Sequence, residues 1–162
     1  MTRDEASAVA PQPNQANPQR SRTWWYAAAA VVSLLGLADA IYLTVEHISG
    51  ESVRCTIIAG CSEVLSSRYA EMGGIPLALI GAAAYFSVFS LATLTVFGYK
   101  GTASLLALLV AGMFLISLWL IYLQAFVIHA FCQYCLFSAG ITILLTVIVF
   151  LARRKTVSTV SR

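Results

Sequence analysis

The residues of this sequence best suited to chemistry are its four cysteines, which form two pairs. Cys132 and Cys135 make a C-x-x-C motif, and Cys55 and Cys61 lie six residues apart in a hydrophilic segment. The C-x-x-C spacing suits a small disulfide ring that opens and closes reversibly. If a helix begins at the motif, its dipole and unpaired N–H groups stabilise the thiolate, the reactive form of cysteine. The motif therefore predicts redox chemistry.

Other interpretations of the cysteines stay open. A C-x-x-C disulfide can staple a turn, although it closes too short a loop to add much stability. A loop pair such as Cys55 and Cys61 is, by itself, more often structural. Four cysteines can also hold zinc, but zinc needs reduced thiolates, which an oxidising compartment disfavours. We expect no metal site.

The two cysteine pairs together indicate a relay. Dithiol–disulfide exchange can carry electrons from a water-exposed pair to a pair that borders the lipid. A lipid-soluble two-electron acceptor is needed there. The expected cofactor is a quinone such as menaquinone, ubiquinone or phylloquinone.

The elements that position these cysteines are membrane spans. Hydrophobic residues make up 59% of the 162 residues and charged residues 10%, against roughly 45–50% and about 25% in soluble domains. Residues 101–152 contain no Asp, Glu, Lys or Arg. As one helix they would be about 78 Å long, so they must form two spans across a hydrocarbon core of about 30 Å. These features exclude a soluble globular domain.

The predicted fold is an all-α integral membrane protein, a bundle of four transmembrane helices. The spans are expected at 24–46, 75–97, 102–127 and 131–152, with a cysteine-bearing outer loop at 47–74. Residues 1–23, which contain several prolines and polar residues, are expected to be a disordered cytoplasmic tail. Residues 153–162 are expected to be a basic cytoplasmic tail.

The distribution of Lys and Arg predicts the orientation. One side carries eight of them: Arg3, Arg20, Arg22, Lys100, Arg153, Arg154, Lys155 and Arg162. The other side carries Arg54 and Arg68. The positive-inside rule then places both termini in the cytoplasm and all four cysteines outside, in the cell's inner (plasma) membrane. An oxidising exterior predicts two disulfides at rest. The net charge of +3 reflects this orientation and does not indicate nucleic-acid binding.

The segment after Cys61 is expected to form a short interfacial helix over the mouth of the bundle. A helix through residues 61–72 would place Val64, Leu65, Tyr69 and Met72 on one face, with Ser62 as its N-cap. An ordinary loop helix is the alternative.

Several other residues are candidates for the redox site. Asp39 is an ionisable residue inside a predicted span, which makes it a functional candidate, unless it only reaches the interface or pairs within the bundle. His129 could favour the Cys132 thiolate or relay a proton, or have no role. Phe131 and Phe137 could line a quinone pocket, although aromatic residues at a span end are usually interfacial anchors.

Three segments of the sequence resemble the vitamin K epoxide reductase family. They are Cys61-Ser-Glu-Val-Leu-Ser-Ser-Arg-Tyr-Ala70, Gly74-Ile-Pro-Leu77 and Phe131-Cys-Gln-Tyr-Cys135. The segment from Tyr42 to His47 is similar to bacterial members. The resemblance covers about residues 24–152 and implies a four-helix bundle around a quinone.

The resemblance also implies a role for each cysteine. Cys135 would face the quinone, and Cys132 would be its exchange partner. Cys61 would exchange with Cys132, and Cys55 with a separate thioredoxin-fold protein outside the cell. Ser67 occupies the position of a loop serine near the family's active site.

Two departures from the vertebrate members bear on the activity. Gly73 stands where they carry an asparagine, and Ala139 where they carry a tyrosine. We therefore expect the bacterial role, the oxidation of thiols in exported proteins. The alternatives are a vitamin K epoxide or quinone reductase of the endoplasmic reticulum, and a non-enzymatic membrane scaffold whose disulfides are structural.

Overall fold

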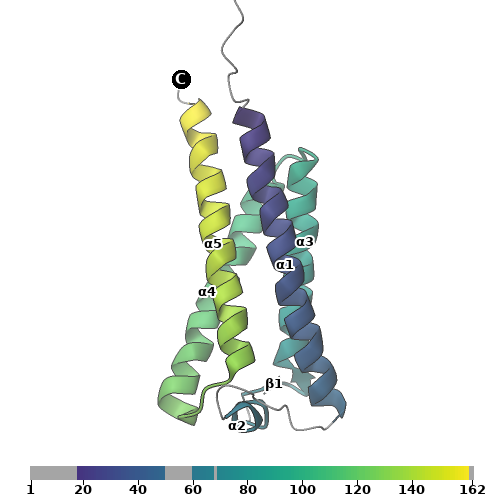
Figure 1. The fold of residues 1–162 in the computed structure, drawn as a ribbon, viewed down its shortest axis with the longest axis vertical. Coiled ribbons are helices and arrows are strands. Elements are labelled where there is room, and N and C mark those ends of the chain that lie inside the picture. Colours follow the sequence, from purple (N-terminus) through teal and green to yellow (C-terminus); the bar gives the residue numbers. More distant parts are fainter. Residues whose placement is uncertain (1–17, 50–59, 68, 161–162) are drawn as a thin grey trace, which may run out of the picture.

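Four long helices make up most of the computed structural model, which describes residues 18–49, 60–67 and 69–160 (Figure 1). They are α1 (Pro18–Ser49), α3 (Leu77–Val96), α4 (Thr102–Leu123) and α5 (Gln133–Val160). A short π-helix, η1 (Gln124–Ile128), continues α4. With η1 counted as the continuation of α4, each of the four contains an apolar stretch long enough to cross a membrane, namely Thr23–Ser49, Leu77–Val96, Thr102–Ile128 and Gln133–Arg154. The predicted all-α membrane bundle is confirmed.

The helices pack through small side chains at their contacts. α1 packs mainly against α3 and α5, and α4 against α5 and α3. The core contains several alanines beside larger residues, including Ala29, Ala82, Ala92, Tyr85, Leu106 and Leu145. Small residues let helix backbones approach closely, which is how helices associate where lipid and protein are equally apolar.

The connections divide between the two ends of the bundle. The start of α1, the end of α5 and the turn between α3 and α4 lie at one end (Figure 1). Gly98 and Gly101 in that turn have φ of 86° and 88°, a conformation that glycine adopts without steric cost. The opposite end carries the remaining short elements and the link between η1 and α5. Below it is called the cysteine end.

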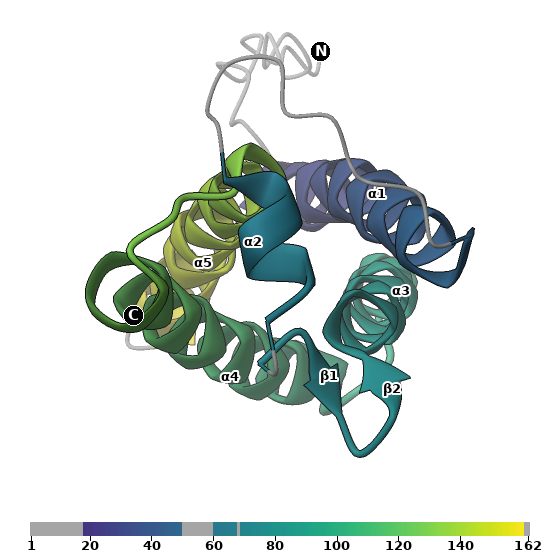
Figure 2. The same cartoon turned by 90° about the horizontal axis from the view of Figure 1, so that it is seen from below.

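A short helix and a hairpin cover the cysteine end. The helix is α2 (Cys61–Leu65), and the strands β1 (Glu71–Met72) and β2 (Ile75–Pro76) pair antiparallel with Glu71 opposite Pro76. Seen from this end, α2 lies across the opening that the four long helices surround (Figure 2). Residues 60–76 are called the lid below, of which residue 68 is not described.

The lid helix is shorter than predicted. It ends at Leu65, so Tyr69 and Met72 do not share a helical face with Val64. The Ser67 hydroxyl donates to the Val64 carbonyl at 2.7 Å, which satisfies that carbonyl in a turn. Ser62 is the second helical residue and not the N-cap; Gly60 provides the carbonyl that accepts the Val64 N–H at 3.1 Å.

Two long helices extend beyond their predicted spans. α1 begins at Pro18, so residues 18–23 are helical, and α5 continues to Val160, so most of 153–162 is helical. Hydropathy marks the part of a helix that lies in lipid, whereas backbone hydrogen bonding continues into the flanking polar residues. The rest of the two predicted tails, residues 1–17 and 161–162, lies outside the described residues.

Candidate active site

The C-x-x-C motif lies where α5 begins. The helix starts at Gln133, and the carbonyl of Cys132 accepts the Leu136 N–H at 3.0 Å. The N–H of Cys132 donates to the side-chain oxygen of Gln124 at 2.9 Å. Cys132 is completely buried, and Cys135 is partly exposed one turn into the helix. The motif therefore sits at a helix N-terminus, where a thiolate is stabilised.

The two sulfurs of the motif differ in their chemistry. Both are free thiols. A hydrogen bond from the Cys135 thiol, helped by the backbone N–H groups of Cys135 and Tyr134, lowers the pKa of Cys132 from 9.0 to about 7, although burial opposes the shift. Cys132 is thus the sulfur that carries the negative charge, and the thiolate is the nucleophile in disulfide exchange.

Cys61 belongs to the same apolar cluster as Cys132. The cluster also contains Leu43, Val64 and Ala130, and both sulfur-bearing side chains are buried in it. Cys61 is disulfide-bonded, while Cys55 lies outside the described residues. Cys132 and Cys135 are free thiols in the structure, and the two disulfides expected at rest stay a prediction. A reversible ring at a helix N-terminus accommodates either redox state.

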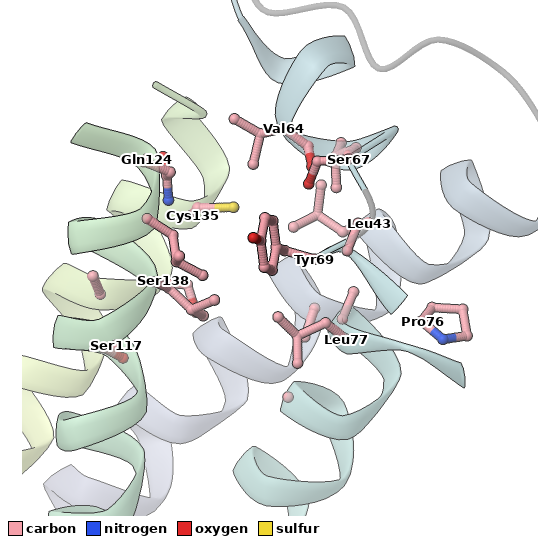
Figure 3. Close-up of a pocket in the computed structure, with 18 of the residues that line it drawn as sticks. Leu43, Val64, Ser67, Tyr69, Pro76, Leu77, Ser117, Gln124, Cys135 and Ser138 are labelled. Carbon is pink, nitrogen blue, oxygen red and sulfur yellow. The ribbon is translucent and has the colours of Figure 1, made fainter. Parts of the chain in front are cut away.

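A cavity of about 140 Å³ lies beneath the lid. The Cys135 sulfur and the Tyr69 ring both project into it (Figure 3). Most of its wall is apolar, with contributions from α1, α3, α4 and α5. The polar residues that line it are Asp39, His47, Ser67, Tyr69, Ser117, Gln124 and Ser138. An apolar cavity with a few converging polar groups is the usual form of a small-molecule site.

A second cavity, of about 390 Å³, adjoins the first between α3 and α4. Tyr69, Leu120 and Ser138 line both cavities. The second is also lined by Ile116 and Trp119, whose side chains are exposed on the outside of the bundle. In a membrane that surface faces lipid. The second cavity therefore lies between the one that Cys135 enters and the lipid-facing surface of the bundle.

A family model described as "Vitamin K epoxide reductase family" matches residues 27–150. This chain belongs to the vitamin K epoxide reductase family. The match includes all of α3, α4 and η1, most of α1 and α5, and the lid. Members of the family are oxidoreductases and are associated with quinones in general.

Two predicted site residues line the cavity of this vitamin K epoxide reductase family member. Asp39 contributes from α1, and its Oδ2 atom is buried without a hydrogen-bond partner among the described residues. Ser67 contributes from the lid. A buried carboxyl oxygen without a partner is costly, and such exceptions deserve a functional explanation.

The two phenylalanines proposed to line a quinone pocket do not line either cavity. The side chains of Phe131 and Phe137 are 41% and 55% exposed and face away from the bundle interior. Phe137 lies two residues beyond Cys135, which is more than half a turn around an α-helix. In this structure the rings fit the interfacial-anchor alternative, and a contact with a quinone stays a prediction.

His129 forms the turn that follows η1. Its φ is 54°, a left-handed conformation, directly after η1. This backbone reversal lets the chain leave α4 and enter α5. The side chain is exposed, and no hydrogen bond to Cys132 is found among the described residues.

Three residues important to the geometry were missed by sequence reasoning. Tyr69 had been assigned to the lid helix, but its ring enters the cavity. Gln124 is a buried amide within an apolar span, and its polarity was a usable signal. Tyr85 donates or accepts hydrogen bonds with the Ser138 and Thr142 hydroxyls at 2.8 and 3.0 Å, joining α3 to α5 beside the second cavity.

Proposed function

We propose that this protein is a quinone-dependent thiol–disulfide oxidoreductase. It reoxidises a separate extracytoplasmic protein of the thioredoxin fold and passes two electrons to a membrane quinone, which supports disulfide formation in exported proteins. The observation that carries the proposal is the position of Cys135, whose sulfur opens into a cavity that adjoins a lipid-facing one. Cys132, its neighbour, is buried in the same cluster as Cys61.

The relay proceeds by two exchanges and one oxidation. The partner's dithiol reduces the disulfide of Cys55 and Cys61, and the partner leaves oxidised. The Cys61 thiolate then attacks Cys132 in the C-x-x-C disulfide, which releases Cys135, and Cys55 displaces Cys132 to restore the loop disulfide. Cys132 and Cys135 are now both thiols, so two electrons and two protons have passed from the partner's dithiol to the C-x-x-C pair.

The last step is the oxidation of the C-x-x-C dithiol, and the structure has the cysteines in the arrangement from which that step starts. Cys61 is oxidised while Cys132 and Cys135 are reduced. In this state the Cys132 thiolate lies beside the Cys135 thiol that borders the cavity. Formation of the disulfide between them releases two electrons and the Cys135 proton; the proton that Cys132 gave up on becoming a thiolate is the second of the two that leave the dithiol.

The cavity residues suit a quinone. A quinone supplies a two-electron, two-proton acceptor with an apolar ring and two carbonyl oxygens. The apolar walls would hold the ring, Asp39 and Ser67 would contact its polar edge, and the opening between α3 and α4 would admit it from the bilayer. The lid would keep water from the reacting sulfurs.

The proposed orientation places the cysteine end outside the cell. Lys100, Arg153 and Arg154 lie at or toward the opposite end, whereas Glu46, Glu63 and Glu71 lie at the cysteine end. This distribution supports a plasma-membrane protein with both termini in the cytoplasm. The thioredoxin-fold partner then meets the lid from the extracytoplasmic side.

The test is quinone reduction by purified protein supplied with a dithiol. We expect the wild-type protein to bleach quinone absorbance when given dithiothreitol, and Cys135→Ala to show only the uncatalysed rate. Ser90→Ala, which removes an exposed hydroxyl from α3, is the matched control and should behave as wild type. A wild-type rate equal to the uncatalysed rate, in protein that is folded and reduced, would reject the proposal.

A further inference from the structure

Gln124 is a buried amide at the point where α4 becomes a π-helix. Its side chain is 3% exposed, and it lies in the apolar stretch Thr102–Ile128. Burying an amide among apolar residues is costly unless its donors and acceptors are satisfied. π-helical turns within α-helices occur frequently at functional sites. Both the oxygen and the NH2 group of this amide therefore need a hydrogen-bond partner.

The oxygen of the Gln124 amide holds the start of α5. It accepts the Cys132 N–H at 2.9 Å, which is one of the N–H groups that helix α5 leaves unpaired. Because an N–H donor must meet the oxygen, the NH2 group of the same amide points elsewhere. Figure 3 shows the nitrogen on the side of the amide that faces Cys135.

The nitrogen of the Gln124 amide has no acceptor in the described protein. The hydrogen bond to Cys132 is the one found for this side chain among the described residues. Gln124 also lines the cavity into which the Cys135 sulfur projects. The cavity therefore contains an oriented hydrogen-bond donor beside the sulfur that faces it.

We propose that the Gln124 amide donates a hydrogen bond to a carbonyl oxygen of the quinone and so positions the quinone against Cys135. The inference rests on the proposed function and adds a binding residue to it. Disulfide formation between the Cys132 thiolate and the Cys135 thiol gives the quinone two electrons, and the quinone becomes a quinol by taking up two protons, one from the Cys135 thiol and one from water in place of the proton that Cys132 had already released. Negative charge develops on the carbonyl oxygens during this transfer, and a preoriented donor stabilises it.

The same side chain thereby links the two reacting partners. Its oxygen holds the backbone of Cys132, and its nitrogen holds the acceptor. Because the amide is planar and rigid, a shift of the Cys132 backbone would also shift the quinone, and the reverse. A ligand of the same shape without carbonyl groups gains nothing from Gln124, so this residue selects quinones over other apolar ring compounds.

The experiment measures binding in the oxidised, full-length protein, where no turnover occurs. The probe is a naphthoquinone with a short isoprenoid chain and ¹³C-labelled carbonyl groups, observed by isotope-edited infrared spectroscopy. In wild type we expect one carbonyl band below its frequency in an apolar solvent. In Gln124→Met the band should return to the apolar-solvent frequency, and the affinity should fall roughly 3- to 10-fold, as for the loss of one hydrogen bond.

Two further variants keep the test decisive. Thr95→Val removes a buried hydroxyl at the other end of the bundle and should leave the band and the affinity unchanged. Gln124→Glu keeps an oxygen for the Cys132 N–H but donates only when protonated. Its quinone affinity should fall as the pH rises, relative to wild type. The other ionisable residues that line the same cavity, Asp39, His47, Tyr69 and Cys135, are identical in both proteins, so the comparison with wild type isolates residue 124.

The outcomes separate the inference from the proposed function. If wild type does not bind the quinone, the proposed function fails. If wild type binds it and Gln124→Met keeps the shifted band and the affinity, Gln124 serves only the helix start and the inference is overturned. If Gln124→Met does not fold, the pH dependence of Gln124→Glu decides in the same way.

Discussion

At the residue scale, the two sulfurs of the C-x-x-C motif are expected to react differently because their surroundings differ. The pKa of Cys132 is lowered to about 7, chiefly by the hydrogen bond from Cys135. The thiolate is the form that reacts with iodoacetamide. We predict that alkylation of Cys132, in a protein whose loop cysteines are replaced by serine, rises with pH through about 7 and then levels off.

The matched variant for this measurement is Cys135→Ala. It removes the hydrogen bond that contributes most to the shift, so the inflection should move upward toward the ordinary value. Mass spectrometry after timed alkylation at each pH gives the profile. An inflection that stays near 7 in Cys135→Ala would show that the helix start alone lowers the pKa.

The order of the relay predicts different losses for the two cysteine pairs. Cys55→Ala removes the sulfur at which a folded protein donor enters, yet dithiothreitol is small enough to reduce Cys132 and Cys135 directly. We predict that Cys55→Ala loses activity with a protein donor and keeps most of it with dithiothreitol, and that Cys135→Ala loses activity with both. Quinone absorbance with each donor is the assay. Equal losses with both donors in Cys55→Ala would reject this order.

Asp39 offers a third test at this scale. Its unpartnered, buried Oδ2 atom lines the cavity, so we expect it to contact the quinone. Asp39→Asn keeps the shape and replaces the ionisable carboxyl group with a neutral amide. Quinone turnover should fall by about tenfold or more, as for one acid–base group, while dithiothreitol still reduces the C-x-x-C disulfide at the wild-type rate. Slower reduction of that disulfide would instead assign Asp39 to the thiols.

At the scale of the helices, the approach of α1 to α3 depends on Gly36. A methyl group at this position would overlap with the ring of Tyr85, whose hydroxyl joins α3 to α5. We predict that Gly36→Ala destabilises the bundle by about 1–3 kcal/mol, the usual cost of overpacking. Thermal unfolding in detergent measures this, and Gly81→Ala, where the nearest atom lies at 3.9 Å, is the control.

The double variant Gly36→Ala, Tyr85→Leu identifies the cause. If the clash with the ring destabilises the protein, the smaller side chain should recover part of the loss, so the two effects will not add. Additive losses would mean that Gly36 matters for some reason other than the Tyr85 ring.

The sequence predicted elements better than it predicted contacts between them. Long uncharged stretches force spans, so all four helices were found, and C-x-x-C at the start of the last helix followed from the polar break at residues 129–135. The end of α2 at Leu65 and the π-helix at Gln124–Ile128 could not be predicted. The end of α2 goes with a local hydrogen bond from Ser67 to Val64, for which the sequence offered no distinct signal. The π-helix adjoins the hydrogen bond from Cys132 to Gln124, which forms only after the start of α5 meets the end of α4.

In the candidate site, the sequence likewise predicted which residues carry chemistry better than it predicted which residues line the cavity. Cysteines carry their chemistry in their type and spacing, and Asp39 is conspicuous because an ionisable residue in a span is rare. The exposure of Phe137 could have been inferred from helical periodicity, since it lies two residues from Cys135. The cavity position of Tyr69 could not, because it requires the fold of the lid over the bundle.

At the scale of the whole molecule, the orientation in the membrane is the remaining prediction. The eight-to-two distribution of Lys and Arg predicts that the cysteine end faces outward. A membrane-impermeant maleimide applied to intact, reduced cells should therefore label Cys55 and Cys61. A cysteine introduced at Ser104, near the turn between α3 and α4, should be labelled only after the cells are opened. The reverse pattern would place the lid in the cytoplasm.

The second cavity, between α3 and α4, determines which concentration of the quinone sets the turnover rate. A substrate that enters through the flank of the bundle arrives by two-dimensional diffusion within the bilayer. Its effective concentration is then its mole fraction among the lipids. Adding empty lipid to proteoliposomes that fuse with it should slow turnover although the quinone per millilitre is unchanged, whereas adding buffer should leave turnover per protein as it was. The rate of this protein would thereby report the composition of the membrane's quinone pool.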